Sequence, residues 1–214
     1  MKAILAFLVF NSAILSIVAA PLHIIKVHFL YGSKPKSEFK TTEPRWFGGI
    51  HGGHVGIEFE ANKVFHFEKK GKLRLFPKPR CSGNSQFSVH SLDSFYAHFG
   101  TGSSKVKKTT FSIPIDKGQY QKLLATIQLY LEKPPYNYAF FGMRCASAMH
   151  DVLEQLEVFR KRPHALTSMR IMYPKRLRNR LFKKAYQMNW EYWTEAGSER
   201  RKWEKDPCRF ETEF

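Results

Sequence analysis

The sequence predicts an α+β fold in which an antiparallel sheet is packed with helices. Two observations predict it. Short apolar segments of strand length lie between residues 23 and 115, whereas from residue 116 onward the apolar residues recur at helical spacing. Strands that come first and helices that come later are typical of this class. A chain of 214 residues that is 43% hydrophobic is long enough for one domain with one sizeable core.

Five short segments have strand character. Residues 23–30 are rich in β-branched side chains, and residues 55–59 and 64–67 alternate well enough to form a hairpin that turns at residues 61–63. Residues 73–76 are expected to extend this sheet. A further strand is expected at residues 109–115.

Three helices are expected in the second half. Asp116 is a good N-cap for a helix that Pro134 and Pro135 end. A second helix should begin near Cys145, because the following apolar residues fall on one face. A third, residues 175–193, carries an apolar stripe with cations beside it. These cations are Arg176, Arg180, Lys183 and Lys184.

The first 20 residues read as a targeting segment. Lys2 precedes an apolar stretch that ends in the small residues Ala19 and Ala20, which is the order of a secretory signal peptide. An uncleaved membrane anchor is the alternative. We therefore expect an exported protein that is periplasmic, secreted or membrane-anchored. Residues 21–159 would then form the main domain, with residues 160–214 as a basic, aromatic, helical extension packed on it.

The charge is strongly lopsided. Lys and Arg number 35 against 18 Asp and Glu, a formal net charge of +17, which favours an anionic partner. Residues 160–214 hold 15 of the basic and 7 of the acidic residues, together with Trp190, Trp193 and Trp203. This mixture suits an anionic membrane surface. Together with export, it also suits a cell-envelope polymer, and nucleic acid is not the expected partner.

Three cysteines are too few for a disulfide scaffold. In an exported protein an odd number leaves at least one thiol unpaired within the chain. Cys81 lies in a loop-like stretch and Cys208 in the polar C-terminal tail, so these two could form a disulfide. Cys145 would then be the free thiol.

Two local features could carry chemistry. His54 heads an apolar strand after a glycine-rich loop, and His66 follows twelve positions later on the return strand. Cys145 opens a helix, and the N-terminus of a helix favours a thiolate. The physical hypothesis is a relay in which His54 takes the thiol proton, His66 orients His54, and backbone N–H groups at the helix start stabilise an oxyanion.

These motifs resemble the circularly permuted papain-like cysteine hydrolases, the group that contains permuted NlpC-type peptidases and lecithin:retinol acyltransferase-like proteins. The resemblance rests on the HVGI strand at His54, on His66, and on the downstream Cys145 after a Tyr/Asn-rich run. It implies Cys145 as the nucleophile, His54 as the base and His66 as the orienting residue. It also implies a permuted papain-like domain and a thioester intermediate formed from peptide amides of the cell-wall type or from lipid acyl esters.

One position departs from the family pattern. Family members often have Asn directly before the nucleophile, where this chain has Arg144. Arg144 could pair with an anionic group of the substrate or point to solvent. Together with Arg144, we take Tyr138 and Gly53 as the candidate substrate-binding residues.

Other interpretations of the same residues stay open. A zinc site built from His51, His54 and His66 is possible in principle, but no ExxH motif or CxxC pair accompanies it. The histidines and Cys145 could also be packing residues only. A non-enzymatic basic module that binds anionic lipid or nucleic acid is the third alternative. No cofactor or metal is expected, and His150 and Asp151 are expected at the surface.

Overall fold

The computed structural model describes residues 23–32, 53–77, 83–100 and 106–197. These residues form an α+β fold with one six-stranded antiparallel sheet, in the order β4-β3-β2-β1-β5-β6, and five helices. The strands are β1 (His23–Leu30), β2 (His54–Glu60), β3 (Lys63–Lys69), β4 (Ser85–His90), β5 (Lys108–Ile115) and β6 (Tyr192–Glu195). The helices are α1 (Leu92–Gly100), α2 (Lys117–Glu132), α3 (Cys145–Gln155), α4 (His164–Arg170) and α5 (Pro174–Met188).

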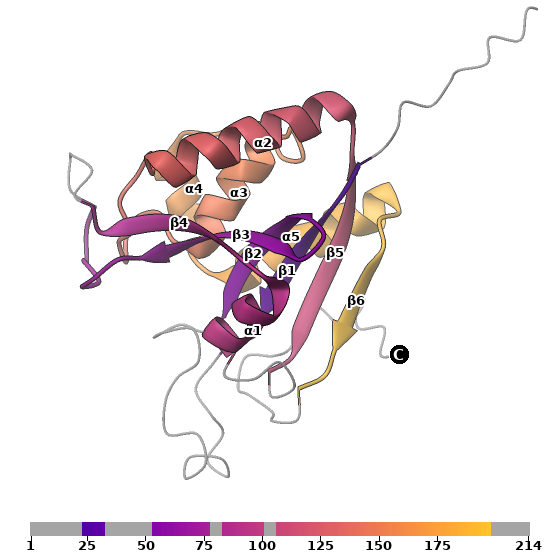
Figure 1. Ribbon diagram of the computed structural model, residues 1–214, viewed down its shortest axis with the longest axis horizontal. Helices are drawn as coiled ribbons and strands as arrows, with labels where there is room; N and C mark the ends of the chain where they lie inside the picture. Colours follow the sequence, from indigo (N-terminus) through magenta and orange to yellow (C-terminus); the bar gives the residue numbers. More distant parts are fainter. Residues whose placement is uncertain (1–22, 33–52, 78–82, 101–105, 198–214) are drawn as a thin grey trace, which may run out of the picture.

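The helices cover the two faces of the sheet unequally. Figure 1 shows α2 and α3 on one side of the sheet and the short α1 on the other. The large core lies between the sheet and α2, α3 and α5, and its sheet side includes Val27, Val55 and Ile57. A much smaller cluster under α1 contains Leu30 and Phe95. The alternation of strand side chains therefore assigns each strand residue to one of two different environments.

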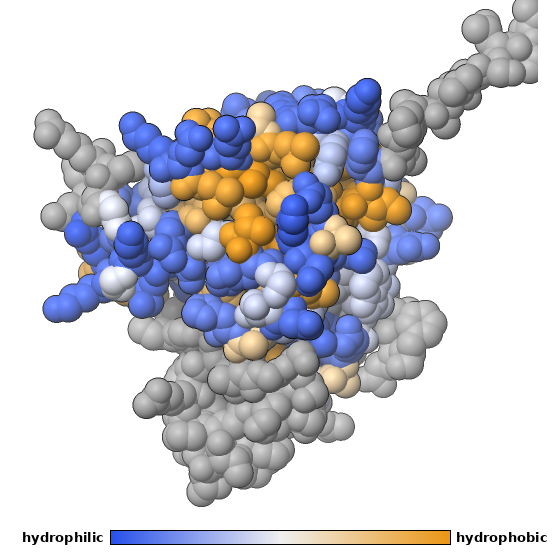
Figure 2. All heavy atoms as spheres, viewed as in Figure 1, coloured by the Kyte–Doolittle hydropathy of each residue, from blue (hydrophilic) through white to orange (hydrophobic). Residues whose placement is uncertain are grey.

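Two leucines near the C-terminal end of α2 are exposed. Leu129 is 60% exposed and Leu131 is 42% exposed. Figure 2 shows apolar side chains gathered beside α2 on this face of the molecule, surrounded by charged ones. The inner side of the same helix buries Leu123, Ile127 and Tyr130.

The β2–β3 hairpin places His54 and His66 on the same face. Gly56 pairs with His66, and the register shifts between Glu58 and Glu60. The turn between the strands holds two residues and not the three that were expected. The bulge in β2 adds the one extra residue that keeps both histidines on the same face. Gly56 is also required sterically, because a Cβ atom there would lie 2.5 Å from a side-chain carbon of Val64.

One predicted strand is wrong, and one predicted helix ends earlier than expected. Residues 73–76 do not extend the sheet: Arg74 forms only an isolated bridge, and Leu75 and Phe76 are exposed. The third helix does not run to residue 193, because Asn189 adopts a left-handed conformation and ends α5 after Met188. The chain then reverses, and β6 pairs with β5.

The C-terminal part of the described chain is integrated with the rest. Leu177, Leu181 and Phe182 of α5 belong to the large core, and β6 forms the edge of the common sheet. None of the described helices is long and apolar enough to cross a membrane. The predicted signal segment, residues 1–20, lies outside the described residues, as do Cys81, Cys208 and Trp203.

Candidate functional site

Cys145 is the first residue of α3, as predicted. The residue before it, Arg144, has extended backbone, and its N–H donates to Ser147 Oγ at 2.7 Å. The Ser147 hydroxyl donates in turn to the Arg144 carbonyl at 3.1 Å. This reciprocal cap satisfies groups that a helix start leaves unpaired and fixes where α3 begins. Cys145 is only 4% exposed.

The surroundings of Cys145 shift the pKa of its thiol in opposite directions. Burial raises its pKa, while Arg144 and the backbone N–H groups of Ala146, Val55 and Cys145 itself act in the opposite direction. Burial is the larger influence, so the thiol is protonated at neutral pH. The expectation of a ready-made thiolate is therefore not what the structure shows. The same N–H groups are, however, correctly placed for negative charge that develops near the sulfur.

The two predicted histidines contact each other. His54 Nε2 and His66 Nδ1 are 3.4 Å apart, and His66 Nε2 lies 3.2 Å from His90 Nδ1. The ring of His54 stacks on Phe99 of α1 with 3.6 Å between centroids. Burial lowers the pKa of His54 well below its usual value and that of His66 to about 3, with further lowering from neighbouring histidines. Both imidazoles are therefore neutral at pH 7.

The structure does not join this histidine pair to the thiol by a hydrogen bond. His54 shares its face of the sheet with Gly56 and contacts α1, whereas Cys145 belongs to the core on the opposite face. The link between them is the backbone of β2: the sulfur lies close to the N–H of Val55, the residue after His54. The Cys145 sulfur thus lies beside the start of β2, while the His54 imidazole on that strand is turned toward α1.

The three predicted substrate-binding residues lie around the thiol or the start of β2. The Arg144 guanidinium lies over the rings of Phe140 at 5.4 Å and Tyr173 at 5.1 Å. Tyr138 hydrogen-bonds to Arg144, and burial followed by the nearby Cys145 raises its pKa. Gly53 has a φ of 94°, and a Cβ atom there would lie 2.5 Å from the Leu30 carbonyl oxygen. Gly53 is therefore needed for the backbone to enter β2.

The neighbours of the histidine pair were not predicted. His90 ends β4, and Phe95, His98 and Phe99 come from α1. A period-2 segment, SQFSVH, precedes an aromatic helix, and this pattern could have revealed both elements.

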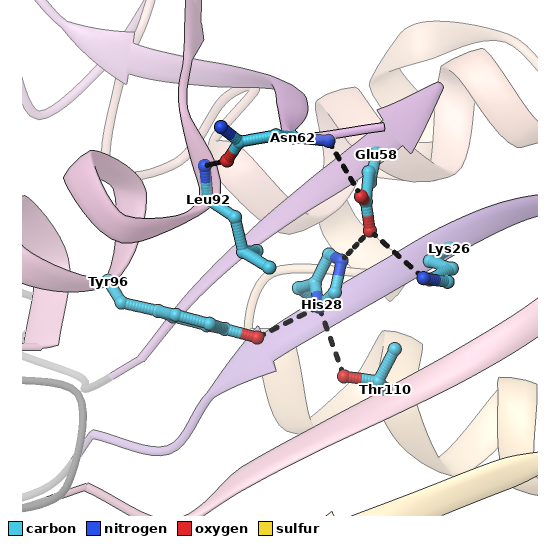
Figure 3. Close-up of polar contacts among 7 residues, drawn as sticks. All are labelled: Lys26, His28, Glu58, Asn62, Leu92, Tyr96 and Thr110. Atoms are coloured by element: carbon cyan, nitrogen blue, oxygen red, sulfur yellow. Dashed lines mark hydrogen bonds and ion pairs between the residues drawn. The ribbon is translucent and has the colours of Figure 1, made fainter. Parts of the chain in front are cut away.

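A second polar network on the same face was also missed (Figure 3). His28 Nε2 lies 2.9 Å from Glu58 Oε2, and its Nδ1 lies 2.9 Å from the Tyr96 hydroxyl and 3.0 Å from that of Thr110. The hydrogen bond from His28 lowers the pKa of Glu58 to about 2, against the effect of burial. This network joins β1, β2, β5 and α1. Its members are almost fully buried, so its role is to hold α1 on the sheet.

The prediction that His150 and Asp151 lie at the surface is wrong. Each is 1% exposed. Asp151 accepts hydrogen bonds from the hydroxyls of Tyr130 and Tyr136 and contacts His164 at 3.1 Å. The helix α3 is covered on its outer side by α2, α4 and α5, which explains the difference. A single-helix pattern does not show how many neighbours surround the helix.

Among the described residues, no group of three or more His, Cys, Asp or Glu side chains is arranged to hold a metal ion. His51, one member of the alternative zinc site, lies outside them. Comparisons with models of protein families, with curated proteins and with solved structures find no match to this chain. The functional assignment therefore depends on the chain's own residues.

Proposed function

We propose that this protein is a cysteine hydrolase of permuted papain-like architecture in which Cys145 is the nucleophile. One observation carries the proposal. The Cys145 sulfur lies at the start of α3 among backbone N–H groups, beside the β2 residue that follows His54. A nucleophile and N–H donors for developing negative charge are two requirements of acyl transfer, and His54, adjacent along β2, is the candidate for the third, the base.

The protonation states favour a general-base mechanism over a resting ion pair. Because the thiol and His54 are both neutral, the proton moves from Cys145 Sγ to His54 as the sulfur attacks the carbonyl carbon. His66 holds Nε2 of His54, which leaves Nδ1 for that transfer. Because the imidazole faces α1 and the thiol lies on the other face of the sheet, the transfer requires the start of β2 to rearrange and bring His54 to the thiol. His54 then protonates the leaving group, and water hydrolyses the thioester.

The substrate is a peptide amide or a lipid acyl ester, because both pass through the same thioester. A cavity of about 370 Å³ is lined partly by Phe141, Gly142 and Met143, the residues that lead to Arg144 and the start of α3. This cavity is mainly apolar in its side chains, which suits an acyl chain or an apolar peptide side chain. We propose an exported location on the basis of the N-terminal pattern.

The pH dependence of turnover tests the mechanism. The lowered pKa of His54 keeps this base neutral under conditions that protonate an ordinary histidine, so kcat/KM on an activated ester should not fall around pH 6.5. The His54→Ala substitution should lower kcat/KM by about two to four orders of magnitude. His66→Ala should lower it less, because His54 transfers protons whereas His66 only orients His54.

The matched control is His23→Ala, which should keep native turnover. The ring of His23 stacks on Tyr120, away from the histidine pair. Near-native turnover of a folded His54→Ala protein would contradict the relay. Loss of activity on chelation would favour the zinc alternative.

A non-enzymatic basic module that binds anionic lipid is the second candidate. The observation that favours it is the absence of a hydrogen bond between the Cys145 thiol and either histidine of the described pair, together with the cationic surface of α5. Vesicle binding by an unmodified protein that turns over neither esters nor amides would establish this candidate.

A further inference from the structure

Four cationic side chains line a pocket between α4 and α5. The pocket has a volume of about 650 Å³. None of the described residues that line it is acidic. Its lining residues are Met169, Arg170, Met172, Tyr173, Arg176, Asn179, Arg180 and Lys183.

The cations of this pocket repel each other. Burial, and then Arg162 and Arg170, lower the pKa of Arg180, and Glu154 offsets only part of this effect. Arg180 also contacts His150 of α3 at 3.2 Å, and this contact fixes its position. Four cations around one space favour a ligand that carries negative charge, and a phosphate accepts several hydrogen bonds from such groups.

The rim of the pocket is apolar and exposed. Met169 is 74% exposed and lines both this pocket and the apolar cavity near the start of α3. Phe141, which also lines that cavity, stacks on Phe76 with 5.3 Å between ring centroids, and the two residues are 48% and 63% exposed. A cationic pocket bordered by exposed apolar side chains matches a membrane surface, where phosphates adjoin acyl chains.

We propose that the α4–α5 pocket binds the phosphate of an anionic lipid headgroup while Met169 enters the adjoining apolar layer. The pocket provides an attachment site that is separate from the thiol chemistry. Tyr173 connects the two sites, because its ring lies in the pocket lining and under the Arg144 guanidinium. Lipid attachment here would bring Cys145 close to the membrane surface.

The test measures binding of the full chain to phosphatidylcholine vesicles with and without phosphatidic acid. Arg176→Glu with Lys183→Glu reverses two exposed lining charges. At low salt it should weaken binding to the phosphatidic acid vesicles at least about tenfold, and less as salt rises. The matched control is Lys70→Glu with Lys72→Glu, which makes the same charge change at exposed positions after β3 and should weaken binding much less.

Two further measurements separate a lipid headgroup from free phosphate. Met169→Glu should lose vesicle binding but retain binding of inorganic phosphate, measured by calorimetry. Binding of inorganic phosphate without binding to phosphatidic acid vesicles would overturn the lipid proposal. Equal loss in the pocket variant and the control would also overturn it, because net charge alone would then explain binding. A Cys145→Ser protein should bind vesicles as the parent does, so this test stands whether or not the hydrolase proposal holds.

Discussion

Glu58→Gln should make the stability of the protein less sensitive to acid. In the native structure the Glu58 carboxylate accepts a hydrogen bond from His28 and another from the Asn62 N–H, and it lies 3.7 Å from the Lys26 ammonium (Figure 3). Its pKa is lowered from 4.5 to about 2. The ionised carboxylate therefore stabilises the folded state at neutral pH.

The size of the effect follows from proton linkage. A carboxyl group with a lowered folded-state pKa stabilises the fold above its unfolded pKa and loses this contribution as pH falls through the folded value. For the two pKa values given, the loss between pH 6 and pH 3 reaches about 2 kcal/mol. Solvent and salt screen the interaction between Glu58 and Lys26, so we expect a loss of stability of about 1–2 kcal/mol between pH 6 and pH 3.

Urea unfolding at pH 6, 4.5 and 3 measures this effect. The free-energy difference between the parent and Glu58→Gln should shrink by that amount between pH 6 and pH 3. Glu60→Gln is the matched control, because Glu60 lies on the same strand with an exposed partner, Lys63. A parent-to-variant difference that is the same at pH 6 and pH 3 would refute the reasoning.

Two matched pairs of substitutions test the packing. Gly53→Ala should lower the free energy of unfolding by about 1–3 kcal/mol, because Gly53 has a positive φ and a Cβ atom there would contact Leu30. Gly71→Ala, with a positive φ but open space around it, should lower the free energy of unfolding by about 1 kcal/mol. Equal losses for the two variants in chemical denaturation would contradict this explanation. Leu153→Ala, in the fully buried part of α3, should cost about 2–5 kcal/mol and Leu129→Ala, at an exposed position of α2, about 0.5 kcal/mol or less. A thermal melt in which Leu153→Ala matches the parent would mean that α3 is not packed as described.

The elements with a clear local period could be predicted from the sequence. The strands at residues 23–30 and 109–115 and the helix from Asp116 to the Pro134–Pro135 stop appear as predicted, because periodicity and capping determine them locally. The end of α5 could not be predicted in this way. The pairing of β6 with β5, more than 70 residues away in the chain, takes residues 192–195 out of the expected helix.

The sequence suggests which residues could form the candidate site, but it does not predict their geometry. The sequence indicates His54, His66 and Cys145, but the facing of a strand depends on where the helices pack. Alternation contained the missing signal: Val55 and Ile57 are apolar and belong to the large core, so His54 faces the other side. The burial of Asp151 depends on the packing of α2, α4 and α5 around α3, and no local pattern encodes it.

Mass spectrometry of a trapped acyl-enzyme tests the central claim most directly. After rapid mixing with an activated acyl ester, the parent protein should carry one acyl group on the peptide that contains Cys145. Cys145→Ser should carry none on that peptide, and His54→Ala should form the adduct far more slowly. An adduct that forms elsewhere in the chain, or at the same rate without His54, would contradict the assignment of Cys145 as the nucleophile and His54 as its base.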